Sequence, residues 1–201
     1  MKNIDLLAAL TPVIGVLEEL GVSYYIGGSV ASSVHGVART TLAVDVVCDL
    51  RAAHVARFVE ALESAYYVDI GMIRDAVARR ACFNVIHLES MIKVDLFVSK
   101  TRGFDRTAMQ RKSREVLDDA EPSFAPFIAS AEDTILSKIE WYRMGGGVSD
   151  RQWRDAVGVM QVRERNLDMA YLRDAAREIG IADLLRRAID EAGTGQGGQP
   201  G

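Results

Sequence analysis

Two aspartates stand inside apolar stretches of the 201-residue chain. Asp45 lies in "AVDVVCDL" and Asp95 lies in "MIKVDLFV". A buried carboxylate usually has a charged partner or a bound cation, because burial of an unpaired charge is strongly unfavourable. If the two stretches are neighbouring strands with both side chains on one face, the carboxylates can hold a divalent cation, and oxygen ligands suit Mg²⁺.

A glycine turn precedes the first of these aspartates. Gly27 and Gly28 follow the strand-like run "VSYYI", and Ser29 is placed to cap a short helix that ends near Gly36. Backbone N–H groups at the start of a helix favour an anion such as phosphate. The alternative is an ordinary tight turn that needs positive φ. Together, the turn and the carboxylates predict a site for a nucleotide.

The elements that position these residues follow from hydrophobic periodicity. It predicts helices over 4–20, 52–65 and 71–80, strands over 22–26 and 43–50, and an antiparallel hairpin formed by "CFNVIHLES" and "MIKVDLFV". Beyond residue 100 the chain becomes polar and basic, and two prolines interrupt a connecting segment. Helices over 130–144, 149–162 and 168–190 are expected to follow, before a Gly/Gln-rich tail.

Composition narrows the class of protein. The net charge of −4 argues against broad, non-specific binding of nucleic acid. Cys48 and Cys82 lie in apolar runs, the N-terminus has no signal-like pattern, and the apolar runs are too short to span a bilayer. We therefore expect a cytoplasmic protein with no membrane segment. Zinc is not expected, because the cysteines and histidines lack ligand spacing.

The ordered set of motifs resembles a known family. "GGSVASSVHGVARTTLAVDVV", followed by "KVDLFV" at 93–98, is similar to the nucleotidyltransferase superfamily typified by DNA polymerase beta, and in particular to its small bacterial AbiEii-like members. That pattern has a Gly-Gly or Gly-Ser turn, two aspartates one residue apart on a strand, and a third aspartate on a later strand. The resemblance covers most of residues 22–100, and "SAEDTILSKIEWYR" with "DRQWRDAVGVM" is similar to the helical region that follows.

The resemblance implies both a fold and an activity. The fold would be α/β (α+β), with a small mixed sheet flanked by helices in residues 1–120, a helical region in 121–191 and a disordered tail in 192–201. The activity would be transfer of a nucleoside monophosphate from an NTP to an acceptor hydroxyl by two-metal catalysis with Mg²⁺ or Mn²⁺. The acceptor is an RNA, a protein or a small molecule, and AbiEii-like relatives are toxins, which implies an antitoxin partner.

The resemblance also assigns roles to individual residues. Asp45 matches the second aspartate and Asp95 the third, as metal ligands and catalytic groups, while Ala43 stands in the place of the first. The residues assigned to nucleotide binding are Gly27, Gly28 and Ser29 in the phosphate turn, Arg39 and Thr41 just before the strand, and Lys138 in the later helix.

Ala43 puts the activity in question. Loss of one of three carboxylates should weaken metal binding and lower the rate by orders of magnitude. The chain is then an inactivated variant, a naturally degenerate nucleotide-binding or regulatory protein, or an enzyme rescued by Asp49. Asp49 is disfavoured because it lies roughly 13 Å further along the strand. Alternatively, Asp45 and Asp95 are surface-facing strand residues or ion-pair partners of Arg39 and Lys93. A third possible function is that of an interaction protein that keeps only the fold.

Overall fold

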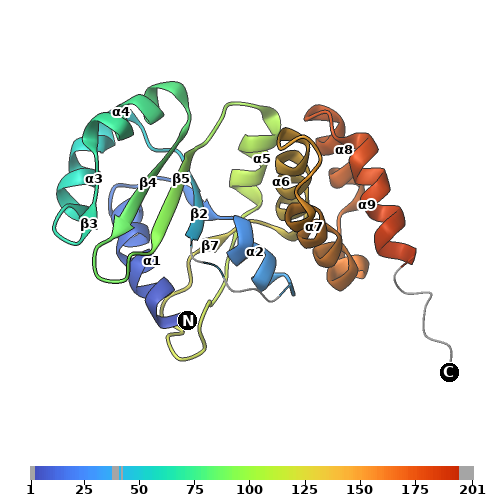
Figure 1. The fold of residues 1–201 in the computed structure, drawn as a ribbon, viewed down its shortest axis with the longest axis horizontal. Helices are drawn as coiled ribbons and strands as arrows, with labels where there is room; N and C mark the ends of the chain where they lie inside the picture. Colours follow the sequence, from blue (N-terminus) through green and yellow to red (C-terminus); the bar gives the residue numbers. More distant parts are fainter. Residues whose placement is uncertain (1–2, 38–40, 42, 195–201) are drawn as a thin grey trace.

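The computed structural model of the chain describes residues 3–37, 41 and 43–194. This part of the chain contains a mixed, seven-stranded sheet on the N-terminal side and a group of helices on the C-terminal side (Figure 1). The strand order is β3-β4-β5-β2-β1-β7-β6. The strands are β1 (Tyr24–Ile26), β2 (Ala43–Cys48), β3 (Tyr66–Tyr67), β4 (Cys82–His87), β5 (Lys93–Val98), β6 (Ser113–Arg114) and β7 (Phe127–Ile128).

The central strands have one buried face and one partly open face. Alternate residues of β2 and β5, such as Val44, Val46 and Val94, are fully buried. They belong to the same core as the apolar side chains of α1 (Asn3–Glu19), α3 (Val55–Leu62) and α4 (Ile70–Arg79). The opposite face carries both aspartates, since β2 and β5 are parallel and Asp45 is in register with Asp95. The expected neighbouring strands with a shared face are therefore confirmed.

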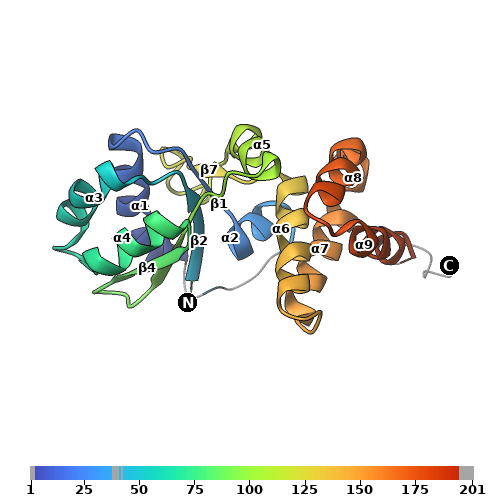
Figure 2. The ribbon, with the colours of Figure 1, turned by 90° about the horizontal axis from the view of Figure 1, so that it is seen from above.

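The helices on the C-terminal side form a second core. They are α5 (Gly103–Arg111), α6 (Ala131–Met144), α7 (Asp150–Arg163), α8 (Met169–Glu178) and α9 (Ala182–Thr194). Ile135, Ile139, Trp153 and Leu172 pack together there, and Phe104 of α5 joins them. In both ribbon views α6 lies between the sheet and the last two helices (Figures 1 and 2). No helix within these described ranges is both long and apolar enough to cross a membrane.

Most of the expected elements are present at the expected places, including the hairpin of β4 and β5 and the helix capped by Ser130. The expected helix over 168–190 is wrong, because Gly180 adopts a left-handed φ of 73° and separates α8 from α9. The expected tail begins too early, since α9 continues to Thr194; residues 195–201 lie outside the described part. Helix α5 and strands β3, β6 and β7 were not expected.

The predicted boundary at residue 120 stays a prediction. The sheet extends past it, because β7 pairs with β1, and the first core includes Ala129. After β7, the first buried residue of the second core is Ile135.

Candidate functional site

The glycine turn and Asp45 form one structural unit. The N–H of Gly27 donates to the carbonyl oxygen of Asp45 over 2.8 Å. Gly28 has a φ of 58°, and a Cβ built on it would lie 1.7 Å from Oδ2 of Asp45. Only glycine fits here, both because of this contact and because side chains rarely adopt such a φ. The turn therefore fixes where the Asp45 carboxylate lies.

Ser29 lies inside the helix that follows rather than at its cap. Helix α2 (Gly28–Val34) has Gly27 as its N-cap residue, with no side-chain cap bond. The expectation that Ser29 caps the helix is therefore wrong. Ser29 is buried in the first turn, where helical geometry leaves backbone N–H groups without a partner in the helix. Its predicted role in phosphate binding thus depends on its backbone and stays a prediction.

The Asp45 carboxylate is in an environment that disfavours its charge. Burial raises its pKa, and the neighbouring charge of Asp95 raises it further. The positive charges of Lys138, Arg151 and Lys93 act in the opposite direction. A bound cation would relieve this repulsion between carboxylates.

Asp95 already has a cationic partner. Nζ of Lys93 lies 3.1 Å from Oδ1 of Asp95, and the Asp95 side chain is 15% exposed. On its other side, Asp95 is in register with Asn84 of β4. The alternative reading of Asp95 as an ion-pair partner of Lys93 thus describes a contact that is present.

Ala43, which the resemblance assigns to the place of the first carboxylate, lies beside the same lysine. Ala43 is in register with Lys93, so its methyl group and the lysine side chain share a face of the sheet. Asp49 does not compensate: it follows the last residue of β2 and its Oδ2 lies 2.6 Å from Nη2 of Arg51. Within the described residues, no group of three His, Cys, Asp or Glu side chains could hold a metal ion.

A cleft of about 460 Å³ opens between this face of the sheet and helices α6 and α7. Its charged lining includes Asp45, Arg80, Lys100, Arg102, Lys138 and Arg151. Its apolar lining includes Tyr25, Val47, Phe97, Phe104, Trp141 and Met144. Gly27 and Gly28 also line it, whereas Asp95 does not. The cleft is large enough for a small-molecule ligand.

Lys138 forms an ion pair with Asp155 rather than with Asp45. It is 3% exposed, and its Nζ donates to Oδ2 of Asp155 over 2.7 Å. Its charge nevertheless lowers the pKa of Asp45, so it contributes to the field in the cleft. Its predicted contact with phosphate would require it to share its ammonium group with Asp155.

Thr41, two residues before β2, makes a hydrogen bond to the backbone of the strand. Oγ1 of Thr41 donates to the carbonyl oxygen of Ala43 over 2.8 Å, which helps to start the strand. Arg39 lies outside the described residues. The predicted roles of these two residues in nucleotide binding remain predictions.

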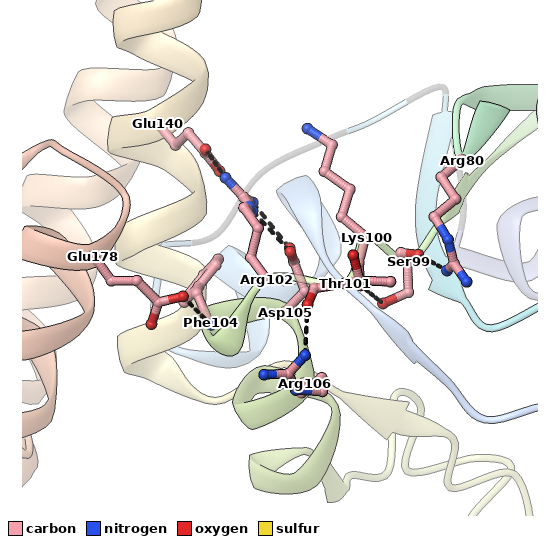
Figure 3. Close-up of polar contacts among 10 residues, drawn as sticks. All are labelled: Arg80, Ser99, Lys100, Thr101, Arg102, Phe104, Asp105, Arg106, Glu140 and Glu178. Carbon is pink, nitrogen blue, oxygen red and sulfur yellow. Dashed lines mark hydrogen bonds and ion pairs between the residues drawn. The ribbon is translucent and has the colours of Figure 1, made fainter.

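A cluster around Arg102, not found from the sequence, joins the sheet to the helices. Its guanidinium group donates to Asp105 over 2.7 Å and to Glu140 of α6 over 2.5 Å (Figure 3). The N–H of Phe104 donates to Glu178 of α8 over 2.8 Å (Figure 3). The segment after β5 therefore fixes α5 against α6 and α8. The Arg102 and Asp105 spacing is visible in the sequence, but nothing there indicates Glu140 or Glu178 as partners.

Comparison with known proteins establishes the fold. No protein-family model matches the sequence, and no curated protein matches it. An antigenic nucleotidyltransferase-like protein from Paracoccidioides brasiliensis is similar in structure, with 15% identity, a TM-score of 0.53 and 94% of each chain covered. The lincosamide antibiotic adenylyltransferase LnuA, solved with lincomycin bound, has 13% identity and a TM-score of 0.51, over 81% of this chain and 98% of that one.

A third similar structure is the antibiotic-resistance factor ANT(2'')-Ia, with 10% identity and a TM-score of 0.54, over 98% of this chain and 100% of that one. At such low identity the likeness concerns the fold alone. The chain has a nucleotidyltransferase fold, as the sequence motifs predicted.

The carboxylates fit one divalent cation better than two. Mg²⁺ is commonly held by one or two carboxylates together with substrate phosphates. Asp45 lines the cleft and meets that requirement by itself, while Asp95, in register with it on the adjacent strand, is paired with Lys93. A second cation would need a further ligand, and Ala43 supplies none.

Proposed function

We propose that the chain binds a nucleoside triphosphate in the cleft beside Asp45, and that its transfer of the nucleoside monophosphate to an acceptor hydroxyl is slow or absent. The observation that carries this proposal is the close packing of the Gly28 turn against Asp45 at the cleft of a nucleotidyltransferase fold. Asp45 is also in register with Asp95 on the neighbouring strand.

Each part of the cleft has a role in this proposal. The N–H groups of Gly28 and Ser29 and the cationic side chains of Lys100 and Arg151 would bind the triphosphate. Asp45 would hold the Mg²⁺ or Mn²⁺ that accompanies the nucleotide, and this cation would draw negative charge from the phosphates. The rings of Phe97 and Trp141, with centroids 5.7 Å apart, offer an apolar wall for a base or an acceptor.

Transfer would be an in-line displacement at the α-phosphorus. The acceptor hydroxyl oxygen forms a bond to the α-phosphorus, the bond from that phosphorus to the bridging oxygen of the β-phosphate breaks, and pyrophosphate leaves. The proton of the hydroxyl needs a base, and Asp95, the carboxylate beside Asp45, is paired with Lys93 and does not line the cleft, which is one reason to expect slow transfer. Because Ala43 offers no carboxylate, we expect the rate to be lower by orders of magnitude than in a complete site.

The second candidate is a non-catalytic nucleotide-binding or regulatory protein. The ion pair of Lys93 with Asp95 favours it, because the carboxylate oxygen that contacts the ammonium group is less available to a metal ion. Both candidates require nucleotide binding, and only the first requires turnover.

The finer assignments are also proposals. An AbiEii-like role with an antitoxin partner is supported by "GGSVASSVHGVARTTLAVDVV" alone. A cytoplasmic location is supported by two free cysteines, Cys48 and Cys82. The mixed apolar and charged lining of the cleft suits an RNA, a protein or a small molecule as the acceptor.

Thermal unfolding with each of the four NTPs and Mg²⁺ tests binding, since a ligand of the folded state raises the unfolding temperature. We expect a rise for the chain, a much smaller rise for Asp45→Asn, and an unchanged rise for Glu60→Gln, an equal charge change at an exposed residue of α3. The same proteins with α-phosphate-labelled NTP, offered RNA, protein and small-molecule acceptors, separate the candidates: transferred label identifies the enzyme. Absence of any rise with all four NTPs would contradict both.

A further inference from the structure

Lys93 lies beside Ala43, the position at which the family resemblance expects a carboxylate. Registered residues on parallel strands point to the same face, so Lys93 lies beside position 43. Its ammonium group reaches along its own strand to Oδ1 of Asp95, at 3.1 Å. The Lys93 side chain therefore lies next to Ala43 and also contacts Asp95.

The charges of Asp45, Asp95 and Lys93 are consistent with a single divalent cation. Asp45 and Asp95 supply two negative charges, and Lys93 supplies one positive charge. Two divalent cations would have only two carboxylates as ligands, and one of these, Asp95, is already paired with Lys93. Asp95 also does not line the cleft, whereas Asp45 does. The ligand set of the second cation is thus incomplete in two ways, at Ala43 and at Asp95.

We propose that the ammonium group of Lys93 takes the place of the second divalent cation. One Mg²⁺ then enters with each nucleotide and is held by Asp45, while Lys93 neutralises Asp95 and fixes its orientation. This inference rests on the proposed binding of a nucleoside triphosphate and specifies how many metal ions accompany it.

The proposal predicts how substitutions combine. A carboxylate introduced alone by Ala43→Asp would stand beside Lys93 and form an ion pair with it, so it would not recruit a metal ion. Lys93→Met keeps the length of the side chain and removes the charge. Only the double variant, Ala43→Asp with Lys93→Met, presents three unpaired carboxylates to a second cation.

The test counts Mn²⁺ ions in solution. The free-ion signal in electron paramagnetic resonance is followed as Mn²⁺ is titrated into each protein with a saturating α,β-methylene analogue of ATP, GTP, CTP or UTP, whichever gives the largest thermal shift. We expect one Mn²⁺ per bound nucleotide for the chain and for Ala43→Asp, and two for the double variant. Arg57→Met, an equal loss of charge on exposed α3, should leave the count at one.

Nucleotide binding is measured in the same samples by the thermal shift. Two Mn²⁺ per nucleotide in the unaltered chain, or a second ion gained by Ala43→Asp alone as tightly as by the double variant, would overturn the role of Lys93 and leave the proposed function standing. No nucleotide binding by the unaltered chain would overturn both. Lys93 is 45% exposed, so loss of folding does not confuse the result, and the unfolding temperature without nucleotide verifies this.

Discussion

Gly28→Ala is expected to break the site by displacing Asp45. The added Cβ would lie 1.7 Å from Oδ2, 2.6 Å from Cγ and 2.9 Å from Cβ of Asp45, so the aspartate must move. In addition, alanine would have to adopt a φ of 58°. Two separate penalties therefore act at this position, one from the backbone and one from the contact.

The two penalties can be separated with a matched control. Gly146 has a φ of 75°, and no atom beyond its two chain neighbours lies within 4 Å of the place that an added methyl group would take, so Gly146→Ala carries only the backbone penalty. That penalty is about 1–2 kcal/mol of unfolding free energy. Gly28→Ala adds the displacement of Asp45, which at the scale of overpacked sites is a further ~1–3 kcal/mol. We expect total losses of about 2–5 kcal/mol for Gly28→Ala and about 1–2 kcal/mol for Gly146→Ala.

Urea unfolding of both variants, and of Gly28→Ala combined with Asp45→Ala, measures these values. Removal of the Asp45 carboxylate should restore at least about 1 kcal/mol to Gly28→Ala, because it removes the two shortest contacts. Nucleotide binding should be lost in Gly28→Ala and retained in Gly146→Ala. Equal losses of stability for the two glycine variants, or no coupling with Asp45, would refute the view that the turn positions the aspartate.

Three further predictions concern the framework around the site. His35 is buried against the Ala129 carbonyl oxygen, and burial lowers its pKa below the ordinary 6.5. The unfolded chain therefore binds more protons in this pH range, so the stabilising contribution of neutral His35 should be full above pH 6.5 and fall as the pH drops below it. Urea unfolding at several pH values should show this decline, and His35→Gln should flatten it. Lys138→Met removes the ammonium partner of buried Asp155 and should lower the unfolding free energy by about 3–5 kcal/mol, whereas exposed Lys100→Met should change it by less than about 0.5 kcal/mol. Arg102→Met should lower it by only about 1–2 kcal/mol, because the guanidinium group is one-third exposed, and should increase protease cleavage near α5; unchanged cleavage would contradict its role in fixing α5.

The central strands were predictable because their residues alternate strictly. In β2 and β5 every second residue is a buried apolar one, and the aspartates interrupt only the open face. The glycine turn was also predictable, since a pair of glycines between a strand and a helix has few structural uses. Spacing along the chain therefore placed Asp45 and Asp95 on the same sheet face.

Contacts between distant residues were not predictable in the same way. Asp155 as the partner of Lys138 depends on how α6 packs against α7, and Glu140 as the partner of Arg102 depends on how α6 packs against the start of α5. Local periodicity carries no information on either. The break at Gly180 was missed because the apolar pattern of α8 continues into α9, although a glycine with Ile181 beyond it is a common helix stop. Strand β7 was missed because it has two residues.

The most direct measurement is a crystal structure of the chain with Mn²⁺ and the non-hydrolysable nucleotide analogue that binds most tightly, with the anomalous signal locating each ion. We expect the triphosphate to lie between the Gly28 turn and the cationic side chains of the cleft, with one Mn²⁺ bound by Asp45 and the Lys93 ammonium group still in contact with Asp95. A triphosphate bound away from Asp45 would contradict the proposed function, and a second Mn²⁺ on Asp95 would contradict the role of Lys93.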